Sequence, residues 1–82
     1  MKIQQQRFLY GGSWHHVLAQ KEKIANKSPN NADAQNALYS ALLRAKMPGI
    51  VIERHRSGHF ASDLTTEALV QQAQSSIGGA DA

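Results

Sequence analysis

Four side chains that can transfer protons or act as nucleophiles lie close together near the middle of the chain. Glu53, His55, Ser57 and His59 belong to the segment PGIVIERHRSGHF, residues 48–60. A carboxylate next to an imidazole can act as a general acid–base pair, and a nearby hydroxyl can be activated for attack. Such groups need a pocket that excludes water and shifts their pKa values. Because we expect this segment to form an exposed hairpin, we predict no catalytic residues and no enzyme activity.

Metal binding is the other chemistry that the histidines offer. His55 and His59 have the spacing HxxxH, and His15 and His16 form a second pair. A zinc site uses three or four ligands, usually with cysteine or a carboxylate among them. The chain has no cysteine and no second HxxxH or HExxH pattern. We therefore predict no metal site and no cofactor, with the histidines at or near the surface.

Basic residues are concentrated in one part of the chain. Residues 1–60 carry all nine Lys and Arg against three acidic residues, a net charge of +6, whereas residues 61–82 carry three acidic residues and no basic one. Segregated positive charge indicates a polyanionic partner, nucleic acid above all. The alternatives are an acidic protein partner, or surface charge that serves only solubility.

Length and composition describe a small soluble protein. A chain of 82 residues forms one domain, which we place at residues 1–77 with a flexible tail at 78–82. No apolar run approaches the roughly 18 residues of a membrane-spanning helix, and the start of the chain lacks a secretory signal. The absence of cysteine favours a reducing compartment. These features predict a cytoplasmic protein without a membrane partner.

The first element that we expect in the chain is an extended segment. Residues 2–10 are predicted to form a strand or an arm that ends at Gly11-Gly12, or a strand from residue 3 that pairs with residues 13–19. We favour a first helix that starts at about Trp14 with Ser13 as its N-cap and ends before Ser28-Pro29. A second helix is predicted at about 32–46, with an apolar stripe formed by Ala34, Ala37, Leu38, Ala41, Leu42 and Ala45.

The central segment itself is predicted to be a β-hairpin. Pro48-Gly49 would stop the second helix, residues 50–55 would form a strand, and Ser57-Gly58 would turn the chain back through Phe60. Asp63 or Thr65 would cap a final helix that runs to about Ile77, with Leu64, Ala68, Leu69, Gln72 and Ala73 on its inner side. The predicted fold class is α+β and mainly helical: an arm or strand, two helices, a β-hairpin and a C-terminal helix.

The segment LLRAKMPGIVIERHRSGHFASDL resembles excisionase and MerR-type DNA-binding proteins just after their recognition helix. In those proteins a helix with a basic end leads through a hydrophobic-Pro-Gly step into a two-stranded wing with arginines, and then into a capped helix. The matching positions, between residues 42 and 64, are Leu42, Leu43, Arg44, Met47, Pro48, Gly49, Arg54, Arg56, Phe60, Ser62, Asp63 and Leu64. The resemblance implies a winged-helix domain that binds duplex DNA in transcription regulation.

A nucleic-acid site follows from this resemblance. Residues at the end of the second helix and on the wing would neutralise phosphates, and polar residues on the solvent face of the second helix would read base edges. Arg54 and Arg56 would share one face of the wing strand. The predicted nucleic-acid-binding residues are Gln35, Asn36, Ser40, Arg44, Lys46, Arg54, Arg56 and His59.

The alternative hypothesis is a protein-interaction module of phage or plasmid type, an inhibitor or adaptor of a larger host complex. Aromatic residues often dominate such contacts. The candidate contacts are Phe8, Tyr10, Trp14 and Tyr39, although Trp14 and Tyr39 would also suit a core. The small residues of the second helix would also let it pack against a second copy of the chain in a homodimer.

Overall fold

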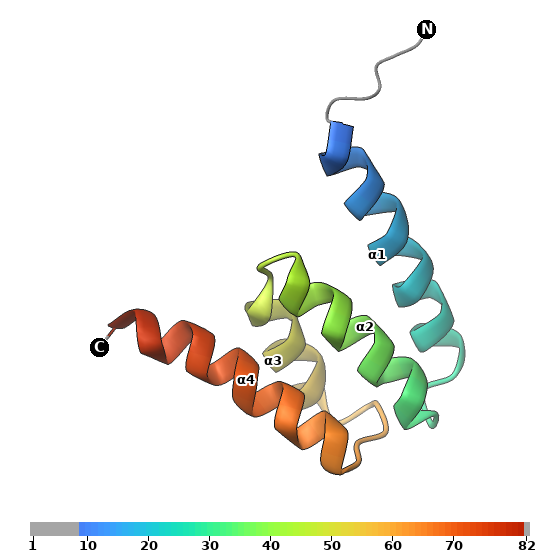
Figure 1. The fold of residues 1–82 in the computed structure, drawn as a ribbon. Helices are drawn as coiled ribbons and strands as arrows, with labels where there is room; N and C mark the ends of the chain where they lie inside the picture. Colours follow the sequence, from blue (N-terminus) through green and yellow to red (C-terminus); the bar gives the residue numbers. More distant parts are fainter. Residues whose placement is uncertain (1–8, 82) are drawn as a thin grey trace, which may run out of the picture.

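The computed structural model describes residues 9–81, which form four helices (Figure 1). They are α1 (Leu9–Lys27), α2 (Ala32–Arg44), α3 (Pro48–Ser57) and α4 (Leu64–Asp81). The described range contains no β-strand, so the predicted α+β fold is wrong and the chain is all-helical there. The arm or strand predicted for residues 2–10 falls mostly outside the described residues, and its last two residues belong to α1.

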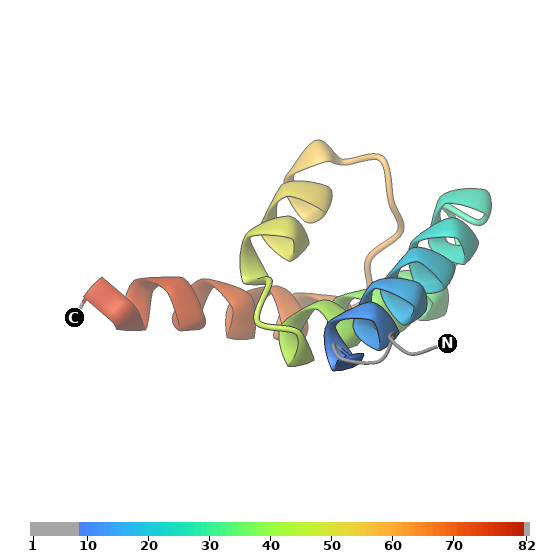
Figure 2. The ribbon, with the colours of Figure 1, turned by 90° about the horizontal axis from the view of Figure 1, so that it is seen from above.

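Helix α2 lies at the centre of the arrangement. Helices α1, α3 and α4 each pack against it, and α3 also packs against α4. Within the described helices, no Cα atom of α1 comes within 8 Å of one in α3 or α4. Seen from above, α1, α2 and α4 form a flat layer, and α3 lies on one face of that layer (Figure 2). A gap between α1 and α3 is therefore left over one side of α2.

The core joins side chains from all four helices. Its buried apolar residues are Ala25, Leu38, Tyr39, Leu42, Val51, Val70 and Ala73. Helix α2 provides three of these, which fits its central position. The predicted apolar stripe of α2 is confirmed at Leu38, Ala41 and Leu42, whereas Ala37 faces solvent.

Helix α2 was predicted more accurately than helix α1, whose expected N-cap, Ser13, lies inside the helix. Helix α1 starts at Leu9, before the predicted start, and contains Gly11-Gly12. Each glycine destabilises a helix interior by about 1 kcal/mol relative to alanine, but glycine can adopt the helical backbone. Residues 13–19 are helical, so the favoured helix is confirmed there and the alternative of a strand is wrong. Helix α2 begins as predicted: Asn31 is its N-cap, and its Oδ1 accepts a hydrogen bond from the Ala34 N–H at 3.2 Å.

The predicted hairpin is instead helix α3. Pro48 occupies the first helical position, where its missing N–H removes no helical hydrogen bond and its fixed φ suits the helix. Gly58 ends the helix with a left-handed φ of 74°, the usual role of glycine after a helix. Pro48-Gly49 and Ser57-Gly58 were interpreted as a helix stop and a hairpin turn, but they are the start and the end of one helix.

Helix α4 begins as predicted, but its inner side differs. Asp63 caps the helix, because its Oδ1 accepts the Thr66 N–H at 2.9 Å. Val70 and Ala73 are buried, whereas Leu64, which was predicted to lie on the inner side, is 88% exposed. Ala68 and Gln72 are exposed as well, and Leu69 is half-buried. The helix continues to Asp81, beyond the predicted end at Ile77.

Two glycines in the central segment give a matched test of helix α3. Gly58→Ala is expected to lower the free energy of unfolding by about 1 kcal/mol, because alanine disfavours the left-handed backbone. Gly49→Ala is expected to raise it by about 0.5 kcal/mol, because alanine favours the helix. A Cβ at either position meets no atom within 4 Å, so packing should not obscure the comparison. Urea unfolding curves measure both, and a hairpin at residues 48–60 would not be stabilised by Gly49→Ala.

Candidate functional site

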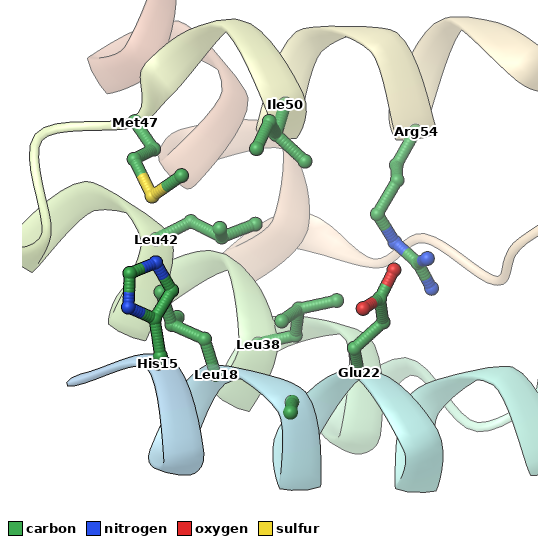
Figure 3. Close-up of a pocket in the computed structure, with 9 residues that line it drawn as sticks. His15, Leu18, Glu22, Leu38, Leu42, Met47, Ile50 and Arg54 are labelled. Carbon is green, nitrogen blue, oxygen red and sulfur yellow. The ribbon is translucent and has the colours of Figure 1, made fainter. Parts of the chain in front are cut away.

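The gap between α1 and α3 forms an apolar groove (Figure 3). Its floor is Leu38 and Leu42 of α2, and its volume is about 220 Å³. One wall belongs to α1 and the other to Met47 and helix α3. The wall residues are His15, Leu18, Ala19 and Glu22 on the first side and Met47, Ile50 and Arg54 on the second. We call this feature the α1–α3 groove.

The polar groups of the α1–α3 groove lie at its ends. Glu22 and Arg54 extend toward one another across one end, and His15 lies toward the other (Figure 3). Glu22 and Arg54 carry opposite charges, which offset one another at that end of the groove. Ile50 in the wall is 39% exposed. The groove therefore offers an accessible apolar surface whose two charged side chains lie at one end.

A buried hydrogen-bond network sets the position of α3 relative to α1 and α2. Gln35 of α2 is fully buried, and its Nε2 donates to the backbone oxygens of Ala25 at 2.9 Å and Ser28 at 3.0 Å. Its Oε1 accepts a hydrogen bond from Arg54 at 2.8 Å. Arg54 also donates to Asn26 Oδ1 at 2.9 Å. One glutamine and one arginine thus connect the end of α1 to the middle of α3.

The loop before α4 completes the surroundings of Arg54. The guanidinium carbon lies 3.8 Å from the ring centre of Phe60, which is a cation–π geometry. The Ala61 N–H donates to the Pro29 backbone oxygen at 2.7 Å, which fixes the loop against the α1–α2 turn. Burial raises the pKa of the nearby Tyr39, although the positive charge of Arg54 opposes this rise. Arg54 is therefore held from several sides by neutral groups.

The predicted nucleic-acid-binding residues do not form one surface, although two of them, Gln35 and Arg54, contact each other. Gln35 is buried, Arg54 binds it, and the Asn36 amide donates to Asp63 at 3.1 Å. The prediction that Arg54 and Arg56 share a face is wrong, because residues two apart in a helix point to different sides. The remaining predicted residues do not line the α1–α3 groove: Ser40 and Arg44 line a shallow hollow between α2 and α4, and Lys46, Arg56 and His59 are exposed.

The predicted aromatic contacts differ in their positions. Tyr39 is 1% exposed and belongs to the core, so it cannot serve as a surface contact in this conformation. Tyr10 and Trp14 belong to the first turns of α1. Phe8 lies outside the described residues. The groove residues Leu18, Ile50 and Met47 were not predicted as contacts. The helical spacing of the apolar residues around each of them could have indicated a shared face.

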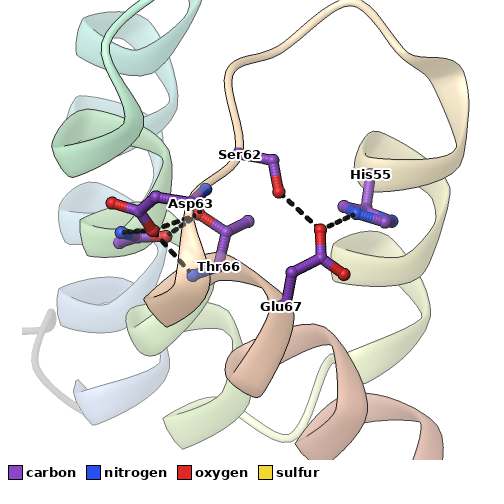
Figure 4. A network of polar contacts seen from close by, with 6 residues as sticks. His55, Ser62, Asp63, Thr66 and Glu67 are labelled. Carbon is purple, nitrogen blue, oxygen red and sulfur yellow. Dashed lines mark hydrogen bonds and ion pairs between the residues drawn. The ribbon is translucent and has the colours of Figure 1, made fainter.

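The predicted chemical cluster is rearranged by the helical fold. His55 Nε2 lies 3.1 Å from Glu67 Oε2, and the Ser62 hydroxyl donates to the same oxygen at 2.7 Å (Figure 4). Ser57 donates to the Arg54 backbone oxygen at 2.7 Å. Activation of a serine nucleophile requires its hydroxyl to donate to a base such as an imidazole. Neither of these two hydroxyls does so. The contacts of Glu67 join α3 to the loop and to α4.

Two carboxylates at the start of α4 have lowered pKa values. The hydrogen bond from the Thr66 N–H lowers the pKa of Asp63, and the side chains of Asn36 and Thr66 add to this effect. The Ser62 hydroxyl lowers the pKa of Glu67, and His55 lowers it further. Both carboxylates are solvent-exposed, so the associated stability is modest. These contacts nevertheless stabilise the ionised forms in the folded state.

The lowered pKa values predict an acid-dependent loss of stability. In the unfolded chain the ordinary pKa values are 3.8 for Asp63 and 4.5 for Glu67. Above these values both carboxylates make their full contribution to the stability of the fold. Their contribution is lost as the pH falls through the lower folded pKa values. In the double variant Asp63→Asn with Glu67→Gln, the urea midpoint should therefore change less between about pH 6 and about pH 3. An unchanged pH dependence would show that these two contacts do not stabilise the fold.

The described part of the chain contains neither a metal-binding cluster nor a membrane-spanning helix. No group of three or more His, Asp or Glu side chains comes together there in an arrangement that could hold a metal ion. None of the described helices combines the length and the apolar character needed to cross a membrane.

Comparisons with known proteins identify relatives of this chain. The family model described as "Yme1-like, N-terminal" matches residues 18–78. The mitochondrial inner membrane i-AAA protease supercomplex subunit YME1 of Saccharomyces cerevisiae is 36% identical over 64 residues. This match covers 78% of the chain but 9% of the yeast protein, so the chain spans about a tenth of that relative's length. No solved structure matches the chain.

These matches overturn several predictions made from the sequence. The resemblance to excisionase and MerR-type proteins is wrong, and so are the inferences of duplex DNA binding, transcription regulation and a phage or plasmid origin. The cytoplasmic prediction conflicts with the yeast relative, whose name places it at the mitochondrial inner membrane. The alternative hypothesis of a protein-interaction module agrees better with a relative named as a supercomplex subunit.

Proposed function

This chain belongs to the Yme1-like N-terminal family, and from this premise we propose that it is a protein-interaction domain of a mitochondrial protease complex. The yeast relative is named as a subunit of an i-AAA protease supercomplex at the inner membrane. The proposal places this chain in the same compartment and gives it the task of holding other proteins at such a complex.

The α1–α3 groove is the observation that carries this proposal. A domain that binds proteins needs an accessible apolar surface, because apolar contacts at the centre of an interface provide much of its affinity. The groove offers such a surface, with Ile50 39% exposed in its wall. Of the nine groove residues, all but His15 lie within residues 18–78, the range that matches the family.

In this proposal the chain binds proteins and does not cleave them. The Ser57 and Ser62 hydroxyls donate to a backbone oxygen and to a carboxylate, respectively. The His55 imidazole lies against Glu67. Proteolysis would then belong to other parts of the complex, which agrees with a match to about a tenth of the yeast protein.

A segment replacement in the yeast relative tests the proposal. One version of the yeast protein lacks the segment that matches this chain, and a second version carries this chain in its place. Affinity purification from mitochondria and native gels then measure supercomplex assembly. We expect the deletion to lose partner subunits and the replacement to recover them. Full assembly of the deleted protein, or a replacement that assembles no better than the deletion, would contradict the proposal.

A further inference from the structure

We propose that the outer side of helix α1 lies on an anionic phospholipid membrane, with its lysines at the lipid phosphates and its exposed aliphatic side chains among the headgroups. This inference rests on the proposed function, which places the chain at the mitochondrial inner membrane. It assigns a partner to the positive charge of residues 1–60, which the α1–α3 groove does not use.

Two aliphatic side chains lie between lysines on the outer side of α1. Val17 and Ile24 are 39% and 57% exposed, and their spacing of seven residues places them on the same side of the helix. At about 100° per residue, Lys21 and Lys27 lie about 60° to either side of Ile24, and Lys23 lies about 100° away. Lys23 and Lys27 are exposed, and Lys21 is half-buried. We call these five residues the outer α1 face.

The outer α1 face is neither covered nor neutralised by the described residues. Helix α1 lies at the edge of the layer, and among the described helices it packs against α2 alone (Figure 1). Its acidic residue, Glu22, lies about 160° around the helix from Ile24 and lines the α1–α3 groove. No carboxylate of residues 9–81 comes within 4 Å of an ammonium group of the three lysines. The positive charge of this face is therefore available to a negatively charged partner.

The composition of the outer α1 face suits a membrane surface better than a protein. Protein interfaces are enriched in aromatic residues, methionine and arginine and depleted in lysine, and their strongest contacts fill pockets. The outer α1 face has none of the enriched types, and none of its side chains lines either hollow described above. A bilayer needs no matching cavity, because lysine stems lie along its surface while their ammonium groups reach the phosphates. Aliphatic side chains between the lysines insert among the headgroups.

The number of these contacts predicts a weak and reversible association. Each lysine near an anionic membrane surface strengthens binding by about fivefold. Burial of one exposed aliphatic side chain adds a further factor of about five to ten. These contacts are too few to anchor the chain, but they orient a domain that a membrane complex already holds in place. In this orientation the α1–α3 groove, on the other side of α1, stays open to protein partners.

Co-sedimentation of the whole chain with lipid vesicles tests this inference. One set of vesicles is pure phosphatidylcholine, and the other contains about one third phosphatidylglycerol, which is anionic. We expect binding to the anionic vesicles to be at least about tenfold stronger, and to weaken as salt is added. The double variant Lys23→Gln with Lys27→Gln should weaken this binding by about 20-fold. Ile24→Ser should weaken it by about fivefold.

Matched variants elsewhere separate the outer α1 face from the effects of net charge and of apolar exposure in general. Lys46→Gln with Arg56→Gln removes two positive charges at exposed positions outside α1. Ile77→Ser repeats the isoleucine change at a 43% exposed position of α4, a helix without basic residues. We expect each control to change vesicle binding by less than about threefold, because charges farther from the bilayer are screened. Amide NMR spectra of the free variants confirm that each one is folded.

Three results would overturn the inference. The first is equal binding to the two kinds of vesicle, and the second is an equal loss of binding in the α1 variants and their matched controls. The third is binding to soluble polyglutamate that is as tight as vesicle binding and unaffected by Ile24→Ser, which would indicate an acidic protein partner instead.

Failure of this inference is distinguishable from failure of the proposed function. The segment-replacement test measures partner subunits, which the proposed function places in the α1–α3 groove. Ile24 does not line that groove. We therefore expect Ile24→Ser to weaken vesicle binding while partner subunits are retained, so each proposal has its own readout.

Discussion

Gln35→Ala is expected to lower the free energy of unfolding by about 3 kcal/mol, the largest effect that we predict for a polar residue of this chain. Gln35 is fully buried and hydrogen-bonded to Ala25 and Ser28 at the end of α1 and to Arg54 of α3. Its removal would leave two backbone oxygens and one guanidinium nitrogen without these bonds, and would also open a cavity. Urea unfolding monitored by circular dichroism measures the loss.

A second glutamine provides the control for this prediction. Gln74→Ala changes the same side chain at an exposed position of α4, and we expect an effect within about 0.5 kcal/mol. Because small domains have total stabilities of only about 5–10 kcal/mol, the Gln35 variant should unfold at a clearly lower urea concentration. Similar midpoints for the two variants would mean that the Gln35 network does not hold α1, α2 and α3 together.

Helix α2 shows what could be predicted from the sequence. Its apolar residues follow a helical spacing, and Asn31 at its start is a strong N-cap. Both features act within a few residues of the chain, so they do not depend on distant contacts. The cap at Asp63 is confirmed for the same reason. Local signals of this kind fix where these two helices begin.

Helix α3 shows where the same reasoning failed. The β-branched run at residues 50–52 was interpreted as a strand, between a Pro-Gly stop and a Ser-Gly turn. A competing helical pattern was present, because Met47, Ile50, Val51 and Arg54 follow a helical spacing. This pattern was not recognised, because Arg54 is charged and was therefore expected to face solvent. The structure shows that tertiary contacts to Gln35 and Phe60 place Arg54 on the inner side of the helix.

The candidate site could not be predicted from local patterns. The α1–α3 groove joins residues 15–22, 38–42 and 47–54, and these segments meet only because α1 and α3 both pack on α2. Polar residues were assigned to the surface by type, and Gln35 was therefore predicted to read DNA bases. Its burial depends on the carbonyl groups of Ala25 and Ser28, ten and seven residues away.

Loss of supercomplex assembly in a groove variant is the second large effect that we expect. Removal of an apolar side chain at the centre of an interface can reduce the affinity by tenfold or more, which corresponds to a binding free energy of about 1.4 kcal/mol or greater. Ile50 is exposed in the groove wall, so Ile50→Ser should impair binding of a partner without unfolding the chain. Ile24 is more exposed and does not line the groove, which makes Ile24→Ser the matched control.

The most direct test of partner binding by the α1–α3 groove compares these two variants inside the yeast relative. The yeast protein carries this chain in place of its matched segment, with either Ile50→Ser or Ile24→Ser, and partner subunits that co-purify from mitochondria are quantified. We predict that Ile24→Ser retains the partner yield of the unaltered replacement and that Ile50→Ser lowers it by about tenfold. Equal partner yields from the two variants would contradict the conclusion that this domain holds its partners in the α1–α3 groove.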